Sequence, residues 1–173
     1  TAHAVVAGRH ADGLHPVQRD VLRYLSRANR FSRGPLAIAT WLGQTKGTVS
    51  KTLSGLEAKG LVVKEPVPGD GRARRLSLTE AGRAVLADDP MLGLLPVLRS
   101  LTPDARAHLG DGLEALLRAA LDARGGREFG QCRACTHFRR RAAGGDPHRC
   151  GLLDVPLSVE DSRLVCIEYE RAA

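Results

Sequence analysis

The segment from Gly34 to Leu78 constrains the fold more than any other part of this chain. It contains two short stretches with apolar residues at helical spacing, separated by Gly43. Two β-rich runs follow, LVVKEPV and RRLSL, with the letters PGDGRA between them. Apolar spacing of this kind predicts helices, and a Pro-, Gly- and Asp-containing connection between β-rich runs predicts a tight hairpin. A helix, a short turn, a second helix and a hairpin together predict a winged helix-turn-helix.

Three helices are predicted before the hairpin, over residues 16–29, 35–43 and 45–60. Pro16 and Pro35 suit a first helical position, and Thr45 can cap the third helix. In the third helix, Val49, Leu53 and Leu56 recur at i, i+4 and i+7 and therefore predict a face that points inward.

The other face of the third helix carries short hydrogen-bonding or cationic side chains within its first two turns. They are Gln44, Thr45, Lys46, Thr48, Ser50 and Lys51. This pattern is typical of a recognition helix that enters a major groove, although an ordinary solvated helix face can look the same. In the hairpin, Arg72, Arg74 and Arg75 are candidates for contacts to a minor groove or its phosphates.

Two stretches resemble the MarR family of bacterial regulators. These are TKGTVSKTLSGLEAKGLV, which begins at Thr45, and LTEAG at Leu78 to Gly82, which follows the strand RRLSL. The resemblance extends from about Leu14 to Arg124. It implies a supporting pair in the wing between Asp70 and Arg72. It also implies a homodimer joined by helices from the chain ends, here residues 89–101 and 102–124.

The chain has a net charge of +7, and this excess lies outside its last quarter. Residues 1–127 carry 19 Lys and Arg against 12 Asp and Glu, whereas residues 128–173 carry 7 of each. A basic surplus of this kind indicates a polyanionic partner, here double-stranded DNA with a pseudo-palindromic site. No apolar run approaches the ~18 residues of a membrane span, so we expect a cytoplasmic protein without a membrane partner.

All four cysteines lie in the last quarter, at Cys132, Cys135, Cys150 and Cys166. The segment has few large apolar residues, and small units of this kind generally need disulfides or a metal. Because a reducing compartment disfavours disulfides, the spacing predicts a centre held by four thiolates. Inert buried thiols and disulfides are the alternatives.

The identity of the metal is less constrained than its ligands. One CxxC followed by two isolated cysteines is common around iron-sulfur clusters, so we favour a 4Fe-4S cluster, with 2Fe-2S as a possibility and zinc as the alternative. His137 and His148 could replace a thiolate, but solvated loop histidines are the simpler interpretation.

The predicted fold class is mainly α with a small β-wing, in two domains. Residues 1–127 form a MarR-like DNA-binding and dimerisation domain, and residues 128–173 form a four-cysteine lobe behind a hinge at Gly125 and Gly126. We expect the core residues of the winged helix to lie before Gly125 and to owe nothing to the metal.

The predicted function is a transcriptional regulator whose DNA binding is modulated by the cysteine centre, as a redox or iron sensor. One alternative is a regulator with a structural zinc site and a small-molecule effector at the dimer interface. Another is an iron-sulfur electron carrier. The sequence has no Ser/His/Asp or nucleotide-binding pattern, so we do not predict an enzyme.

Overall fold

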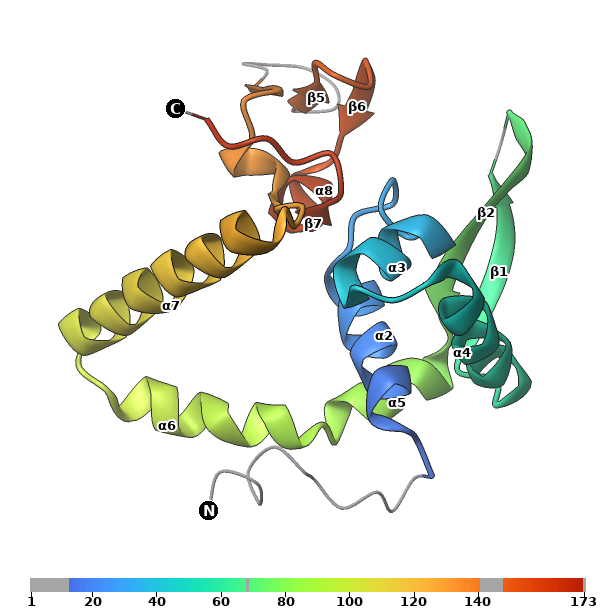
Figure 1. The fold of residues 1–173 in the computed structure, drawn as a ribbon, viewed down its shortest axis with the longest axis horizontal. Helices are drawn as coiled ribbons and strands as arrows, with labels where there is room; N and C mark the ends of the chain where they lie inside the picture. Colours follow the sequence, from blue (N-terminus) through green and yellow to red (C-terminus); the bar gives the residue numbers. More distant parts are fainter. Residues whose placement is uncertain (1–12, 68, 141–147, 173) are drawn as a thin grey trace.

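The computed structural model describes residues 13–67, 69–140 and 148–172, apart from the side chains at positions 71 and 72. Three parts are visible in Figure 1: a winged helix, an arm of two helices, and a C-terminal lobe. The lobe lies close to the winged helix. The arm leaves the winged helix and returns to the lobe, and an open space separates it from both along most of its length. None of the helices in these ranges is long and apolar enough to cross a membrane.

The three helices predicted for the winged helix are present. They are α2 (Pro16–Arg27), α3 (Pro35–Leu42) and α4 (Lys46–Ala58). The α3 helix ends at Gly43, whose φ of 61° is the left-handed conformation that glycine adopts without strain. The Thr45 side chain accepts a hydrogen bond from Thr48 N and caps α4, as predicted.

The wing is an antiparallel pair formed by β1 (Val62–Val67) and β2 (Asp70–Leu78). The sequence predicted a six-residue tip and a second strand that begins at Arg74, but β2 already begins at Asp70. That boundary was wrong because an irregularity in pairing after Pro66 lets the strands continue toward the tip. Helix α5 (Glu80–Ala87) follows, and a Cβ at Gly82 would lie 2.1 Å from Leu61 O, so glycine is required for this close approach.

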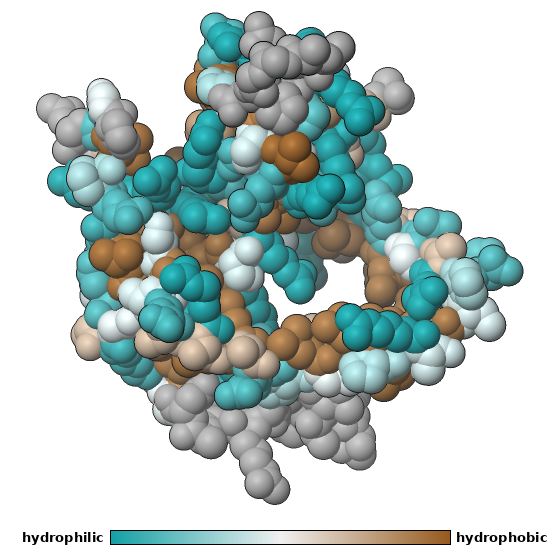
Figure 2. Space-filling model, turned by 180° about the vertical axis from the view of Figure 1, so that it is seen from behind, coloured by the Kyte–Doolittle hydropathy of each residue, from teal (hydrophilic) through white to brown (hydrophobic). Residues whose placement is uncertain are grey.

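The predicted helix over residues 89–101 consists of two elements. They are a 3₁₀ turn, η1 (Pro90–Gly93), and α6 (Leu94–Ser100). Helix α7 (Pro103–Arg124) then completes the arm, and neither α6 nor α7 has a buried residue. Large apolar side chains remain exposed on both helices, and Figure 2 shows apolar residues gathered along the α6 part of the arm.

The C-terminal lobe consists of short elements. In order they are β3 (Gly130–Gln131), η2 (Cys132–Ala134), β4 (Phe138–Arg140), β5 (His148–Cys150), β6 (Val155–Leu157), α8 (Val159–Arg163) and β7 (Val165–Cys166). Strands β4, β5 and β6 form an antiparallel sheet in that order, and β3 pairs with β7. A capping box at Ser158 begins α8.

The lobe contributes to the winged-helix core, contrary to the expectation that this core lies entirely before Gly125. Ile167 is buried in the same cluster as Leu22, Ile38 and Leu56. The ring of Phe129 packs edge-on against Trp41 and Tyr24. The expectation was wrong because the chain after α7 turns back and returns to the loop between α2 and α3, instead of extending away from the winged helix.

Candidate nucleic-acid interface and cysteine centre

The predicted recognition surface is exposed on α4. Val49, Leu53 and Leu56 are buried, as predicted, and they fix which side of the helix faces outward. All six predicted contact residues are exposed: Gln44, Thr45, Lys46, Thr48, Ser50 and Lys51. The Thr45 and Thr48 hydroxyls lie 3.0 Å apart, which engages them in the helix cap. Lys46, Ser50 and Lys51 therefore lie on the outward surface of α4, and Gln44 lies just before the helix cap.

The wing residues differ in their surroundings. Arg74 is exposed, whereas Arg75 is partly buried and its guanidinium lies 3.5 Å from the Glu65 carboxylate. Asp70 Oδ1 accepts a hydrogen bond from Ala73 N, three residues further along β2. The Arg72 side chain lies outside the described part of the chain, so its pairing with Asp70 stays a prediction.

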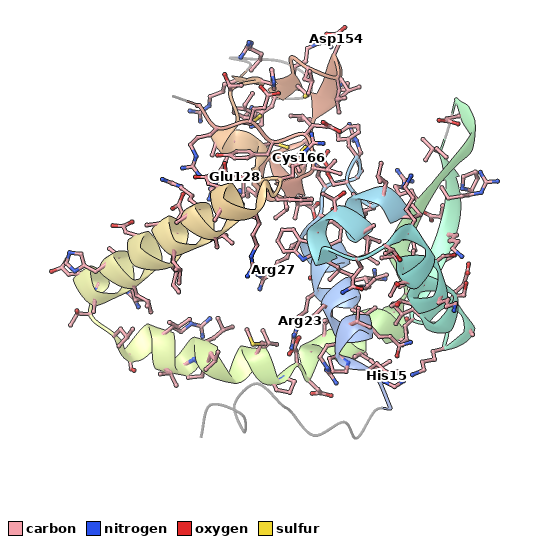
Figure 3. The ribbon with its side chains drawn as sticks, viewed as in Figure 1. His15, Arg23, Arg27, Glu128, Asp154 and Cys166 are labelled. Atoms are coloured by element: carbon pink, nitrogen blue, oxygen red, sulfur yellow. The ribbon has the colours of Figure 1, made fainter. Side chains whose placement is uncertain are left out.

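The four cysteines are free thiols that the lobe brings to one region. Cys132 and Cys166 are buried with Leu157 in one cluster, and Cys150 packs against it. Pairing of β3 with β7 brings the start of η2 next to Cys166, which Figure 3 places on the side of the lobe that faces the winged helix. Cys135 N donates to Cys132 O, which closes the CxxC into a tight turn.

All four sulfurs are hydrogen-bonded, and Cys166 is bonded to the backbone of Glu168 and to the side chains of Asn29 and Ser32. Asn29 Nδ2 donates to Cys132 Sγ at 3.2 Å, Glu170 N to Cys135 Sγ at 3.5 Å, and Leu153 N to Cys150 Sγ at 3.5 Å.

The Cys132 and Cys166 sulfurs form a hydrogen-bonded pair, and this lowers the pKa of Cys166. The same bond, together with burial, raises the pKa of Cys132. Burial raises the pKa of the nearby Tyr24 hydroxyl, and the Cys166 sulfur adds to that effect. The pair therefore shares one proton most easily, with the thiolate on Cys166.

The sulfurs do not yet form a coordination site in this arrangement. Among the described residues, no group of three or more His, Cys, Asp or Glu side chains converges closely enough to hold a metal ion. The donor set itself suits a soft metal, because four thiols lie in one lobe and each sulfur has a hydrogen-bond partner from the surrounding chain. Binding would require Cys135 and Cys150 to turn toward the Cys132–Cys166 pair.

Neither candidate histidine is a simple solvated loop residue. His137 Nε2 lies 2.9 Å from the Glu170 carboxylate. His148 lies in β5, packs against the Phe138 ring, and has a buried Nδ1 without a hydrogen-bond partner among the described residues. The expectation of a solvated loop position was wrong for His148 because the segment that follows the CxxC folds into a sheet.

Sequence reasoning missed the loop that receives the lobe. Asn29 and Ser32 are fully buried polar residues between α2 and α3, and both bond to the cysteine segment. Arg30 adds an ion pair with Asp161 and a hydrogen bond to Pro156 O. No periodic or motif signal marks these residues, because each acts through a partner more than 100 positions away.

Comparison with known proteins agrees with this geometry. Residues 12–73 match the model of the MarR family. The match spans α2, α3, α4 and most of the wing, and it includes neither the arm nor the lobe. No curated protein sequence matches the chain significantly.

Several solved structures share the fold. A MarR transcriptional regulator from Methanosarcina mazei is 21% identical, with a TM-score of 0.55 over 69% of this chain and 86% of that one. Streptococcus pneumoniae FabT in complex with DNA is 22% identical, with a TM-score of 0.54 over 70% and 85%. A mutant of S. aureus MepR is 20% identical, with a TM-score of 0.52 over 69% and 89%. At these identities the likeness shows the MarR-type winged-helix fold.

Proposed function

We propose that this protein is a DNA-binding transcriptional regulator of the MarR type, whose operator binding is modulated by a metal centre at the four cysteines. The observation that carries the DNA-binding part is the outward surface of α4. Its residues are exposed while the opposite face is locked into the core, which is how a recognition helix is presented to a major groove. The likeness to the FabT structure, solved with DNA, supports the same function.

In this proposal the exposed side chains of α4 and of Gln44, just before it, divide into two roles. Lys46 and Lys51 neutralise phosphates, whereas Gln44 and Ser50 can bond base edges. The wing arginines, Arg74 foremost, reach the flanking minor groove or its backbone.

The arm supplies a homodimer in this proposal. Its exposed apolar residues include Leu95, Val97, Leu98, Leu109, Leu113, Leu116 and Leu117. Exposure of so many apolar side chains to water is unfavourable in free energy. A second copy of the chain, related by two-fold symmetry, can bury them. Two recognition helices related by that symmetry would read two half-sites about one helical turn apart.

An iron-sulfur cluster is the proposed occupant of the cysteine centre, with zinc as the alternative. Cys132, Cys135, Cys150 and Cys166 would hold it, while Leu157, Phe31, Phe138 and Tyr169 shield the sulfurs from water. A bound cluster would supply sensitivity to oxidants and to iron supply. The chain itself contributes the N–H groups that stabilise thiolate charge.

A small-molecule effector is the second candidate for regulation. A cavity of about 580 Å³ lies between α2 and the arm and is lined by Tyr24, Trp41, Leu95 and the Arg23–Asp89 pair, among others. Apolar walls with a few charged groups suit an amphipathic ligand. In that case the cysteines hold a structural zinc ion.

The DNA-binding part is tested by replacing Lys51→Ala and following binding to an operator duplex across salt concentrations. If Lys51 meets a phosphate, affinity falls and the slope of log K against log salt decreases by about 1. Arg118→Ala is the matched control, because it removes one positive charge from the arm and should leave the slope unchanged. An unchanged slope in Lys51→Ala, or an equal change in both variants, contradicts the assignment.

The metal part is tested on protein purified anaerobically from iron-rich cells. Iron, sulfide and a brown absorption band are expected in the wild type, and Cys135→Ser should lose most of them. If the protein is colourless and contains zinc, the centre is a zinc site and the cluster hypothesis is wrong. Full metal retention after each of the four serine replacements would exclude the site.

A further inference from the structure

The loop between α2 and α3, Ala28 to Arg33, is shared by the lobe and the winged helix. From the lobe, Val165 forms a parallel bridge with Ala28, and its carbonyl accepts a hydrogen bond from Asn29 N at 2.9 Å. Ile167 N donates to Ser32 Oγ at 2.9 Å. The strand that carries Cys166 is therefore held by the backbone and side chains of this loop.

Asn29 connects the sulfurs to the loop through its side chain. Its Nδ2 donates to Cys132 Sγ, and its Oδ1 accepts from Phe31 N at 3.1 Å and from Ser32 Oγ at 2.8 Å. The residue is fully buried, so water cannot replace these partners. A change at the Cys132 sulfur thus alters a bond that the loop depends on.

The other end of the loop reaches the DNA-binding elements. Leu76 N in strand β2 donates to Arg33 O at 2.9 Å, and the Tyr24 hydroxyl in α2 donates to Ser32 O at 2.7 Å. The loop is therefore bonded on one side to the cysteine segment and on the other to the wing and to α2. Figure 1 shows the lobe beside this junction and far from the outer end of the arm.

We propose that Asn29 is a positioning residue that couples the state of the cysteine centre to the DNA-binding surface through the α2–α3 loop. The proposal rests on the proposed function, and it names the route of its regulation. The Cys132 sulfur accepts the Asn29 Nδ2 bond, so a metal held by that sulfur would act directly on the side chain of Asn29. Asn29 Oδ1 passes a displacement of that sulfur to Phe31 N and Ser32 Oγ, and the loop carries it on to Tyr24 in α2 and to Leu76 in the wing.

The test uses Co²⁺ as a probe, because it binds thiolate sites and its absorption reports the ligands. For each variant of the full chain, the operator affinity of the Co²⁺-loaded protein is divided by that of the reduced, metal-free protein. The wild type is expected to show at least a roughly five-fold ratio. In Asn29→Ala the cobalt–thiolate band should remain, while the ratio falls to about 1 because the link to the loop is cut.

Arg30→Ala is the matched control, since Arg30 lies in the same loop and contacts the lobe without touching a sulfur. It should keep the wild-type ratio. If Asn29→Ala does not fold, Ser32→Ala interrupts the same path one bond further along and gives the same test.

The outcomes separate the two proposals. Absence of a cobalt–thiolate band in the wild type, or absence of operator binding in both forms, overturns the proposed function itself. A wild-type ratio of 1 with both activities present overturns coupling between the sites. A wild-type ratio that persists in Asn29→Ala, or is lost equally in Arg30→Ala, overturns the role of Asn29 alone.

Discussion

Among the described residues, one apolar cluster contains fifteen buried residues of the winged helix together with Ile167, whereas the cluster at the centre of the lobe buries only Cys132, Cys166 and Leu157. The first cluster is large enough to stabilise its helices by burial of apolar surface. The second is not, and two of its three buried residues are cysteines. The lobe must therefore draw stability from its neighbours, and in our proposal from a metal.

Each of the two parts contributes a residue to the cluster of the other part. Ile167 of the lobe lies in the winged-helix cluster, and Phe31 of the winged helix packs against the cysteine cluster. These contacts show that the lobe packs as part of the same fold as the winged helix. Five substitutions compare the stability that comes from the two clusters with that from the polar contacts around them.

The largest effect is expected for Leu53→Ala, which removes a fully buried side chain from the centre of the large cluster. The free energy of unfolding should fall by about 3 kcal/mol, because both burial and packing are lost. Urea denaturation followed by circular dichroism measures it. Leu157→Ala, equally buried in the cysteine cluster, is the comparison and should chiefly speed alkylation of Cys132 and Cys166. An equal loss of global stability in both variants would mean that the two clusters are one.

Ile167→Ala should destabilise the winged helix by about 2 kcal/mol, although residue 167 belongs to the lobe. The expected loss lies at the lower end for such a change because Ile167 is at the edge of its cluster. The readout is the fluorescence of Trp41 during denaturation. If the transition of Trp41 does not move, the lobe does not contribute to the stability of this core.

Asp89→Asn should cost about 1.5 kcal/mol at pH 7, because Asp89 accepts two hydrogen bonds of 2.6 Å from Arg23 and its side chain is only 5% exposed. The bonds from Arg23 lower the pKa of Asp89, so this stabilisation is present above the pKa of an unfolded Asp. It disappears as the pH falls through the lower pKa of the folded state. The stability difference between wild type and variant should therefore shrink below about pH 4, and a difference that grows on acidification would contradict this assignment.

Arg30→Ala should have the smallest effect and lower the free energy of unfolding by about 0.5 kcal/mol. It removes the ion pair with Asp161, which joins the winged helix to the lobe. The Arg30 side chain is 40% exposed and its contact to Asp161 is 3.3 Å, so solvent screens most of the attraction. Thermal unfolding at low and high salt provides the measurement. A loss above about 2 kcal/mol would show that this pair, and not the buried Asn29–Ser32 bonds, holds the lobe in place.

Local sequence patterns predicted the winged helix well. Pro16, Pro35 and Thr45 mark helix starts through backbone chemistry that acts within one turn, and the structure places the helices there. The wing boundary was less accurate because strand length depends on pairing across the hairpin, which begins at Asp70 and not at Arg74. The exposure of the α4 contact residues followed directly from the inward positions of Val49, Leu53 and Leu56.

The sequence by itself determined the helices, the hairpin and the gathering of all cysteines in one segment, because spacing and residue type act over short distances along the chain. Only the tertiary structure decided that this segment returns to the α2–α3 loop and that Cys132 meets Asn29 across 103 positions. Such contacts depend on which buried donors and acceptors satisfy one another once the chain is compact. A single Asn or Ile carries no sign of a distant partner, so the link between the sulfurs and the winged helix is visible only in three dimensions.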